Sequence, residues 1–319
     1  MQITAIEYKL GSKVETLKEL GQHNPDWQID RLLAKTGIAQ RHIASSKESP
    51  LSNAEEACAR LFRYCERQSV DGLIYVTQSP DSHIPTTACL LHERLNLPKH
   101  CLAFDLNLGC SGFIYGLSVA TALMKIGHVS KCLLVCAEAY SKYISLHDRT
   151  CRPIFSDGAS VALIDPHGTG DLGPFVFATD GGGAPNLTLK NNDGIADVGD
   201  QVLYMNGPKV LDFTMKEVPA SVMRLIDKAQ IKLSDIDMFV FHQASKVVLD
   251  RVRRKLNLDE SKVFRNYENM GNTVSATIPI AIKEAKHLGL LGQNMTVLLM
   301  GFGVGYSLAG CIAVSYTHL

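Results

Sequence analysis

The chain has 319 residues, of which 46% are hydrophobic and 20% are charged. These proportions are typical of a globular protein that can bury a sizeable core without disulfides or metals. Thirty-two basic residues balance 32 acidic ones, so the charge gives no indication of a nucleic-acid partner or an anionic membrane. No apolar run reaches the length of about 18 residues that a membrane span requires. We therefore expect no nucleic acid and no membrane as partner.

The cysteines indicate a reducing compartment. There are nine, an odd number, and Cys132, Cys136 and Cys311 lie in apolar segments. Scattered thiols of this kind are typical of a cytoplasmic protein, and the first ten residues lack the basic start and apolar stretch of a signal peptide. No CxxC and no zinc-like grouping of Cys and His occurs, so we expect no metal.

Short apolar segments rich in β-forming residues alternate with helical patterns along the chain. Strands are predicted at residues 73–76, 101–106, 132–137, 238–241 and 296–300. Strands that alternate with amphipathic helices are typical of α/β layers around a largely parallel sheet.

The order of these elements occurs twice. Each copy contains a strand, a helix ending in LNL, a strand, a glycine and a long helix closed by another glycine. Gly109 and Gly127 are 18 residues apart, as are Gly271 and Gly289. We interpret this as two fused homologous halves, residues 1–167 and 168–319, related by a pseudo-twofold axis. The alternative is a chance likeness, because short α/β patterns are generic.

The duplication aligns three polar positions. Cys110 in the first half corresponds to Asn272 in the second, and Gln78 corresponds to the pair that contains His242. Each follows a predicted strand, and open α/β sheets bind ligands at the carboxyl ends of their strands. Packing about a pseudo-twofold axis would bring Cys110, His242 and Asn272 together.

Cys110 lies in GCSGF, between a predicted strand and a predicted helix. A sharp turn there exposes a nucleophile, and the helix N-terminus favours the thiolate. Glycines on either side let backbone N–H groups approach an acyl oxygen. The alternative is a core cysteine beside glycines that permit close helix packing.

His242 and Asn272 also have ordinary interpretations. A histidine after a buried strand is often a hydrogen-bonded structural group, and an asparagine that opens a helix is often an N-cap. Neither residue is decisive alone. Together with GCSGF and the glycine-rich GFGVGYS at 301–307, they form a specific set.

At these motifs the sequence resembles the β-ketoacyl-acyl carrier protein synthase III family of the thiolase superfamily. FHQAS, MGNTVSATIPIA, DRTCRPIFSDGASVALI and KTGIAQRHIA fit the same family in the same order, to about residue 314. The resemblance implies a duplicated five-layer αβαβα fold and a catalytic triad of Cys110, His242 and Asn272. It also implies a homodimer.

The resemblance further implies a mechanism. Cys110 accepts an acyl group from a thioester, which is acyl-CoA or an acyl group on a carrier protein. Backbone N–H groups of Cys110 and Val304 bind the oxyanion. A malonyl thioester on acyl carrier protein then loses carbon dioxide while His242 and Asn272 stabilise the enolate, which attacks the acyl-cysteine. The substrates are thioesters, and no further cofactor is implied.

Other residues match family positions. Arg149 matches an arginine near the CoA adenine, although an ordinary salt bridge is an equal alternative. Gly207 and Ser245 match pantetheine-lining positions, with Ser245 in place of the usual asparagine. Ile154 and Phe155 match acyl-pocket residues, and Ile84 matches a residue that closes the partner's pocket across the dimer. The predicted docking site for the acidic carrier protein consists of Lys246, Arg251, Arg253, Arg254 and Lys255; its alternative is a solvated face.

Two other functions remain open from the sequence. The first is an acyltransferase that uses the same acyl-cysteine to make an ester, amide or thioester without decarboxylation. The second is a non-catalytic, carrier-binding partner subunit, which would need no intact Cys-His-Asn set. The last residues, SYTHL, differ from the family's usual end and are interpreted as a cloning or sequencing scar.

Overall fold

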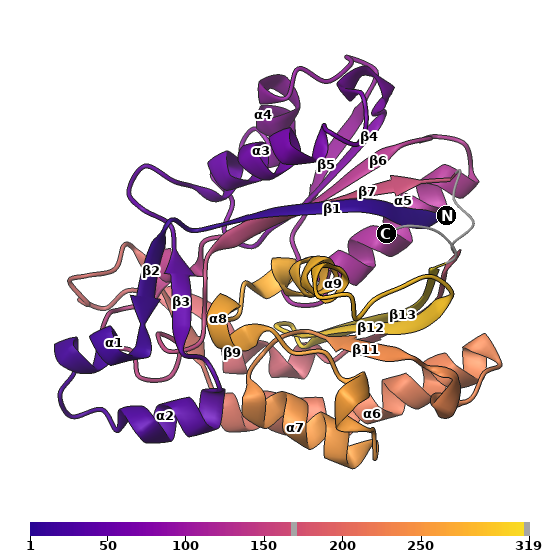
Figure 1. Cartoon of the computed structure of the whole chain (residues 1–319). Helices are drawn as coiled ribbons and strands as arrows, with labels where there is room; N and C mark the ends of the chain where they lie inside the picture. Colours follow the sequence, from indigo (N-terminus) through magenta and orange to yellow (C-terminus); the bar gives the residue numbers. More distant parts are fainter. Residues whose placement is uncertain (167–170, 316–319) are drawn as a thin grey trace.

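The computed structural model describes residues 1–166 and 171–315, and Figure 1 shows them as alternating layers of helix and sheet. The first sheet has the strand order β1 (Gln2–Leu10), β7 (Gly158–Asp165), β6 (Cys132–Glu138), β4 (Gly72–Val76), β5 (Leu102–Leu106). The second has the order β11 (Met238–Phe241), β12 (Met295–Gly303), β13 (Ser307–Ser315), β8 (Asp171–Thr179). All five strands expected from the sequence are present.

Both sheets are mixed, so the expectation of a largely parallel sheet is wrong. β5, β4 and β6 run parallel, whereas β7 is antiparallel to β6 and β1 is antiparallel to β7. In the second sheet β11 and β12 are parallel, and β13 and β8 are added antiparallel. Hydrophobic periodicity locates strands but carries no information on their direction, and antiparallel neighbours need no crossover helix to mark them in the sequence.

Helices complete a five-layer arrangement (Figure 1). The outer face of the first sheet is covered by α3 (Pro50–Leu61) and α4 (Thr87–Arg94). The layer between the sheets contains α5 (Gly112–Lys125) and α9 (Thr277–His287). The outer face of the second sheet is covered by α6 (Gly207–Ala229) and α7 (Lys246–Lys255). The five-layer αβαβα fold expected from the sequence is confirmed, and β4 and β6 are buried on both faces because helices flank them on both sides.

The duplication is visible in the topology. β4, β6, β7 and β1 of the first sheet pair with one another in the same order and directions as β11, β12, β13 and β8 of the second. One predicted element differs: the counterpart of β5 is only an isolated parallel bridge between Phe239 and Val263. The short helix α8 (Tyr267–Met270) follows it. The predicted boundary between residues 167 and 168 lies outside the described residues, as do residues 316–319 of the unusual C-terminus.

The two glycines that close the central helices adopt the same conformation. Gly127 after α5 has φ +75° and Gly289 after α9 has φ +71°. A left-handed residue at this position ends a helix by turning the chain back on its last carbonyls, and glycine adopts it without strain. The equal 18-residue spacing between the glycines in the sequence therefore reflects two corresponding helices that end in the same way.

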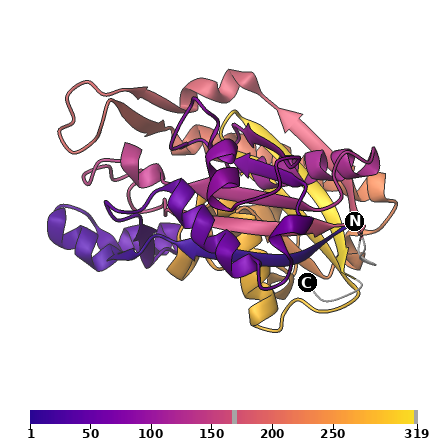
Figure 2. The same cartoon turned by 90° about the horizontal axis from the view of Figure 1, so that it is seen from above.

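Two smaller units project from the layered body. One contains β2 (Lys13–Thr16), α1 (Leu17–His23), α2 (Ile29–Thr36) and β3 (Gln40–Ile43); the other is the hairpin of β9 (Leu187–Asn191) and β10 (Gln201–Met205). Figure 2 shows that both extend from the same side of the molecule. The hairpin contributes one wall of the cavity described below.

Candidate active site

Cys110 occupies the turn between β5 and α5, and only 6% of its surface is exposed. The glycines near it have steric causes. A side chain at Gly112 would collide with Val76 of β4, so this glycine lets α5 pack closely on the first sheet. A Cβ atom at Gly303 would lie 2.8 Å from the Cys110 sulfur. The thiol therefore lies directly against the backbone of the C-terminal glycine-rich segment.

The surroundings of the Cys110 thiol oppose its ionisation in the unliganded chain. Burial raises the pKa of Cys110 to about 12, although hydrogen bonds from the backbone N–H groups of Val304 and of Cys110 itself lower it. The N–H groups favour the thiolate, as expected from the sequence, but desolvation outweighs them in the unliganded chain. Both N–H groups nevertheless lie beside the sulfur, where an oxyanion hole would need them.

His242 follows β11, and its backbone N–H extends the ladder to the carbonyl of Met300 at 2.9 Å. Its Nδ1 lies 2.7 Å from Oγ1 of Thr277, and that hydroxyl donates to the carbonyl of Val274 at 3.0 Å. Because the hydroxyl hydrogen is directed at Val274, Nδ1–H donates to Thr277, and Nε2 is left as an acceptor. Burial lowers the pKa of His242 to about 3, so the ring is neutral at pH 7.

The side chain of Asn272 is oriented at both of its polar atoms. Its Oδ1 accepts the backbone N–H of Val274 at 2.9 Å, and its Nδ2 lies 3.4 Å from Nε2 of His242. Its backbone is held as well, because its N–H donates to Ile154 and its carbonyl accepts from Ser156. The N-cap role considered for Asn272 is wrong, because Thr273 is the N-cap of the 3₁₀ turn Val274–Ala276 and Asn272 lies one residue before it. The same geometry directs the amide nitrogen at the histidine.

The end of β12 lies against both halves of the site. The ring of Phe302 meets the ring of His242 edge-on, with 5.7 Å between the centroids, and the next residue, Gly303, contacts the Cys110 sulfur. Val274 lies in the same apolar cluster as Cys110. The tertiary structure therefore brings together the cysteine, the histidine and the asparagine that the sequence singled out.

The sequence interpretation missed Glu138, a buried carboxylate at the end of β6. Its oxygens accept hydrogen bonds from Ser79 Oγ at 2.6 Å, Ser275 Oγ at 3.0 Å and the backbone N–H of Gln78 at 3.1 and 3.2 Å. Burial raises the pKa of Glu138 to about 7, while these hydrogen bonds lower it. The carboxylate ties the ends of β4 and β6 to the segment that carries Asn272. One signal was present: an acidic residue closes the apolar run CLLVCAE.

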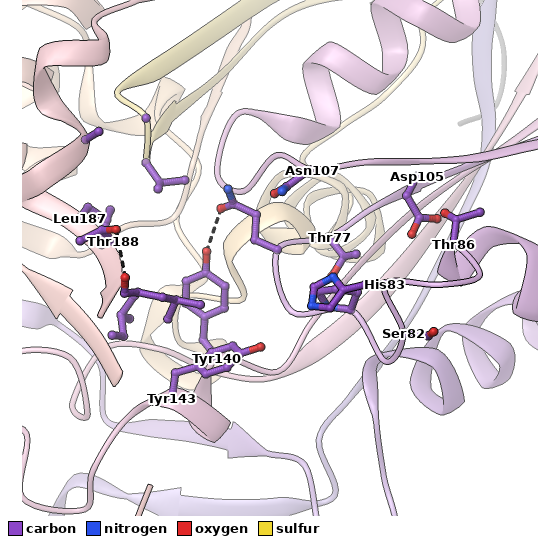
Figure 3. Close-up of a pocket in the computed structure, with 17 residues that line it drawn as sticks. Thr77, Ser82, His83, Thr86, Asp105, Asn107, Tyr140, Tyr143, Leu187 and Thr188 are labelled. Carbon is purple, nitrogen blue, oxygen red and sulfur yellow. Dashed lines mark hydrogen bonds between the residues drawn. The ribbon is translucent and has the colours of Figure 1, made fainter. Parts of the chain in front are cut away.

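A cavity of about 580 Å³ lies beside these residues, between the ends of the first-sheet strands and the β9–β10 hairpin. Figure 3 shows its walls, with Tyr140, Tyr143 and Leu187 on one side and Ser82, His83, Thr86 and Asp105 on the other. Gln78 and Val304 also line it, and both pack against Gly109, the residue before Cys110. The cavity therefore begins next to the candidate nucleophile.

Two family models match the chain. The model described as 3-oxoacyl-[acyl-carrier-protein] synthase III matches residues 104–182, and the model of the C-terminal part of the same synthase matches residues 226–314. The β-ketoacyl-[acyl-carrier-protein] synthase III of Streptococcus agalactiae serotype III is 34% identical over 302 residues, which is 92% of this chain and 91% of that protein. The chain belongs to the β-ketoacyl-acyl carrier protein synthase III family.

Solved structures of synthase III proteins share the fold over their whole length. A 2.1 Å crystal structure of a 3-oxoacyl-(acyl-carrier-protein) synthase III is 42% identical, with a TM-score of 0.92 and 99% of each chain covered. The structure of the enzyme from Thermus thermophilus is 32% identical, with a TM-score of 0.91 and 100% of each chain covered. The thiolase-like fold class expected from the sequence is confirmed.

The predicted CoA-binding residues of this synthase III family member lie in three separate segments. Arg149 is exposed in the loop that follows the 3₁₀ turn at Tyr140–Tyr143. Gly207 is the first residue of α6, with open space around its Cα. Ser245 precedes α7 and is 5% exposed, and its hydroxyl has no hydrogen-bond partner within the described part of the chain. Their contact with CoA remains a prediction.

The predicted acyl-pocket residues separate into two groups. Phe155 is buried in the apolar cluster that contains Cys110, and its ring lies 5.4 Å from that of Tyr140. Ile154 packs on the same cluster. Ile84 is 93% exposed and does not line the cavity, although its neighbours in sequence do. Its predicted role across a dimer requires a second chain and remains a prediction.

The predicted carrier-docking residues differ in their exposure and in their hydrogen-bond or ion-pair partners. Lys246 pairs with Asp250 at 2.7 Å, one turn along α7. Arg253 is half-buried and donates to the carbonyl of Leu258 at 3.3 Å. The remaining three are exposed: Arg251, Arg254 and Lys255. These three are the cations of the helix best placed to meet an acidic partner.

Other features bear on cofactors and location. Within residues 1–166 and 171–315, no group of three or more His, Cys, Asp and Glu side chains is arranged to hold a metal ion. None of the helices in these ranges is long and apolar enough to cross a membrane. All nine cysteines are free thiols.

Proposed function

We propose that the chain is a condensing enzyme that forms a β-ketoacyl thioester from an acyl group on Cys110 and a malonyl thioester. The observation that carries this is the meeting of Cys110, Val304, His242 and Asn272 at one place in a synthase III fold. The Cys110 sulfur faces two backbone N–H groups, and the imidazole and the amide face one another at 3.4 Å. An acyltransferase that does not decarboxylate needs the cysteine but not the paired imidazole and amide.

Acylation is the first step. The Cys110 sulfur attacks the carbonyl carbon of an acyl-CoA, and the bond from that carbon to the CoA sulfur breaks. The thiol proton ends on the departing CoA sulfur. The N–H groups of Cys110 and Val304 bind the oxyanion that forms in between. Because the pKa of Cys110 is raised in the empty site, the thiol is the main form there, and the sulfur loses its proton as it attacks.

Condensation is the second step. A malonyl thioester loses carbon dioxide, and the resulting enolate oxygen accepts hydrogen bonds from Asn272 Nδ2 and His242 Nε2. The histidine must then carry its hydrogen on Nε2. The hydroxyl of Thr277 permits this, because it can turn from the Val274 carbonyl and donate to Nδ1 instead. The carbanion attacks the acyl-cysteine, the carbon–sulfur bond to Cys110 breaks, and the β-ketoacyl thioester leaves. The Cys110 thiolate then takes a proton from water and returns to the thiol.

The test is intact-protein mass spectrometry after incubation with acyl-CoAs of two to twelve carbons, followed by malonyl-carrier protein and measurement of released carbon dioxide. We expect one adduct, absent in Cys110→Ala and retained in Cys89→Ala, which changes an exposed cysteine. His242→Ala should acylate but release no carbon dioxide. Transfer of the acyl group without carbon dioxide would establish the simple acyltransferase. If neither acyl-CoA nor acyl-carrier protein gives an adduct on Cys110, the result would favour the non-catalytic partner subunit.

Several further points belong to this proposal. We propose that acyl carrier protein docks on α7, that CoA contacts Arg149, Gly207 and Ser245, and that two copies of the chain form a homodimer through the segment of Ile84. The halves are proposed to divide at residues 167 and 168, which the repeated sheet topology supports. The nine free thiols support a reducing, cytoplasmic location.

A further inference from the structure

The cavity beside Cys110 contains a polar pair that the condensation mechanism does not use. Tyr140 donates its hydroxyl hydrogen to Oε1 of Gln78 at 2.9 Å (Figure 3). Both residues line the cavity. Gln78 Oε1 also occupies the place that a side chain at Gly109 would need, so the pair lies next to the residue that precedes Cys110. An acyl group on the cysteine that extends into this cavity therefore lies near the pair.

The pair has unused hydrogen-bonding capacity. The backbone N–H of Gln78 donates to the Glu138 carboxylate, and its Oε1 accepts from the Tyr140 hydroxyl. The two hydrogens on its Nε2 have no acceptor within residues 1–166 and 172–314. The oxygen of the Tyr140 hydroxyl can accept a further hydrogen bond. Together the two side chains present a donor and an acceptor to the cavity.

The far wall of the cavity is polar as well. Thr86 lines it with a buried hydroxyl that has no hydrogen-bond partner within the described residues. Ser82, His83, Asp105 and Asn107 also line the cavity. Of these, Asp105 already accepts the backbone N–H groups of Thr87 and Ala88, and His83 and Asn107 are exposed. A saturated chain would cover the Thr86 hydroxyl and the Gln78 amide hydrogens without satisfying them, and each polar group buried without a partner costs on the order of 1–3 kcal/mol.

We propose that the acyl group accepted by this enzyme carries an oxygen, as a hydroxyl or a keto group, within a few carbons of the thioester. The proposal rests on the proposed function. The oxygen accepts a hydrogen bond from Gln78 Nε2, and a hydroxyl substituent also donates to Tyr140. The covalent chemistry is unchanged: the acyl carbon moves from the CoA sulfur to the Cys110 sulfur, and the thiol proton moves to CoA. Gln78 and Tyr140 act as specificity-determining residues.

The test compares acyl-CoAs that differ by one oxygen. Butyryl-CoA, 3-hydroxybutyryl-CoA and acetoacetyl-CoA each have a four-carbon acyl group, and acylation of Cys110 is followed by quenched-flow mass spectrometry. We expect the two oxygenated groups to acylate at least about tenfold more efficiently than butyryl, since a site with buried polar groups rejects an analogue that leaves them unpaired. Gln78→Leu and Tyr140→Phe should each remove most of that preference. Tyr64→Phe, at an exposed tyrosine bonded to Glu7, should keep it.

The outcomes separate the two proposals. Equal acylation by all three groups in the unaltered enzyme overturns the specificity and leaves the proposed function intact. A preference that survives in both Gln78→Leu and Tyr140→Phe also overturns it, because the pair is then not its source. Tyr140→Phe removes a single oxygen atom, so a folding failure of Gln78→Leu would still leave one variant that decides. If no acyl thioester modifies Cys110, the proposed function fails and the specificity fails with it.

Discussion

Cys110 illustrates how one buried atom responds to opposite influences. Two backbone N–H groups lower its pKa, burial raises it, and the balance lies at about 12. A thiol that stays protonated in the empty site resists oxidation and alkylation, since the thiolate is the reactive species. The same N–H groups remain available for the oxyanion when an acyl group arrives. Burial thus protects the thiol at rest, and the two N–H donors stabilise the oxyanion during the reaction.

The raised pKa predicts the pH dependence of Cys110 alkylation. The thiolate fraction increases with pH until the pKa is reached, so the iodoacetamide rate should rise about tenfold per pH unit from pH 7 to 10 without a plateau. The rate is measured by peptide mass spectrometry, with the exposed Cys89 as an internal standard in the same digest. A plateau below pH 9 would show that the N–H groups, and not burial, dominate.

Thr277 is a positioning residue for His242, and its hydroxyl is the only part that the mechanism needs. Thr277→Val keeps the shape of the side chain and removes the hydrogen bond to Nδ1. We expect the rate of condensation to fall by roughly tenfold or more. The rate of Cys110 acylation should stay within about twofold of that of the unaltered enzyme. Thr277→Ser, which keeps the hydroxyl, should restore condensation. Equal losses in both steps would indicate a structural role only.

At the scale of elements, α7 combines an apolar face with a basic one. Leu249 and Val252 are buried against the second sheet, so the exposed cations point away from it. Lys246 is already paired with Asp250, which leaves the C-terminal part of the helix as the open positive surface. Cations at a helix C-terminus also stabilise the helix dipole. Sequence composition alone could not tell the paired cations from the free ones.

Reversing the free charges tests the docking proposal. Arg251→Glu combined with Lys255→Glu should raise KM for malonyl-carrier protein about tenfold, leave kcat and the KM for acyl-CoA nearly unchanged, and lose this effect in high salt. Lys99→Glu, an exposed reversal in the loop between α4 and β5, serves as the control. An unchanged KM for the carrier substrate would contradict docking on α7.

At the scale of the whole molecule, a buried ionic network joins the N-terminal projection to the active site. Glu15 of β2 accepts two hydrogen bonds from Arg152, at 2.9 and 3.1 Å, and forms an ion pair with Arg41 of β3. Arg41 also donates to the carbonyl of Phe155 at 2.9 Å. Burial lowers the pKa of Arg41 to about 9, so its guanidinium group remains charged at pH 7. Glu15 is the carboxylate that forms ion pairs with both arginines.

Removing that carboxylate should strongly destabilise the fold. Glu15→Ala removes the carboxylate that forms ion pairs with two buried arginines, and we expect a loss of about 3–5 kcal/mol in the free energy of unfolding. Glu56→Ala removes an exposed pair with Arg60 on α3 and should cost less than about 1 kcal/mol. Urea denaturation followed by circular dichroism measures both. Similar losses in the two variants would show that the Glu15 network contributes little.

The sequence by itself determined the strands and the duplication, and it singled out Cys110, His242 and Asn272, whose catalytic roles stay predictions. Strands buried on both faces appear as uninterrupted apolar runs, and duplicated elements keep their spacing. Strands and duplication can therefore be predicted from the sequence. The motif residues could be singled out because they follow the ends of predicted strands, where sheets present side chains to ligands.

Only the tertiary structure decided the rest. Strand direction, the protonation of Cys110 and the tautomer of His242 depend on atoms that are distant in sequence, such as Val304 and Thr277. Glu138 and the pairing of Gln78 with Tyr140 likewise join segments that meet only after folding. Burial and hydrogen bonding depend on which residues surround a group in the folded chain. For these groups they determine the pKa and the protonation state, which residue type alone does not determine.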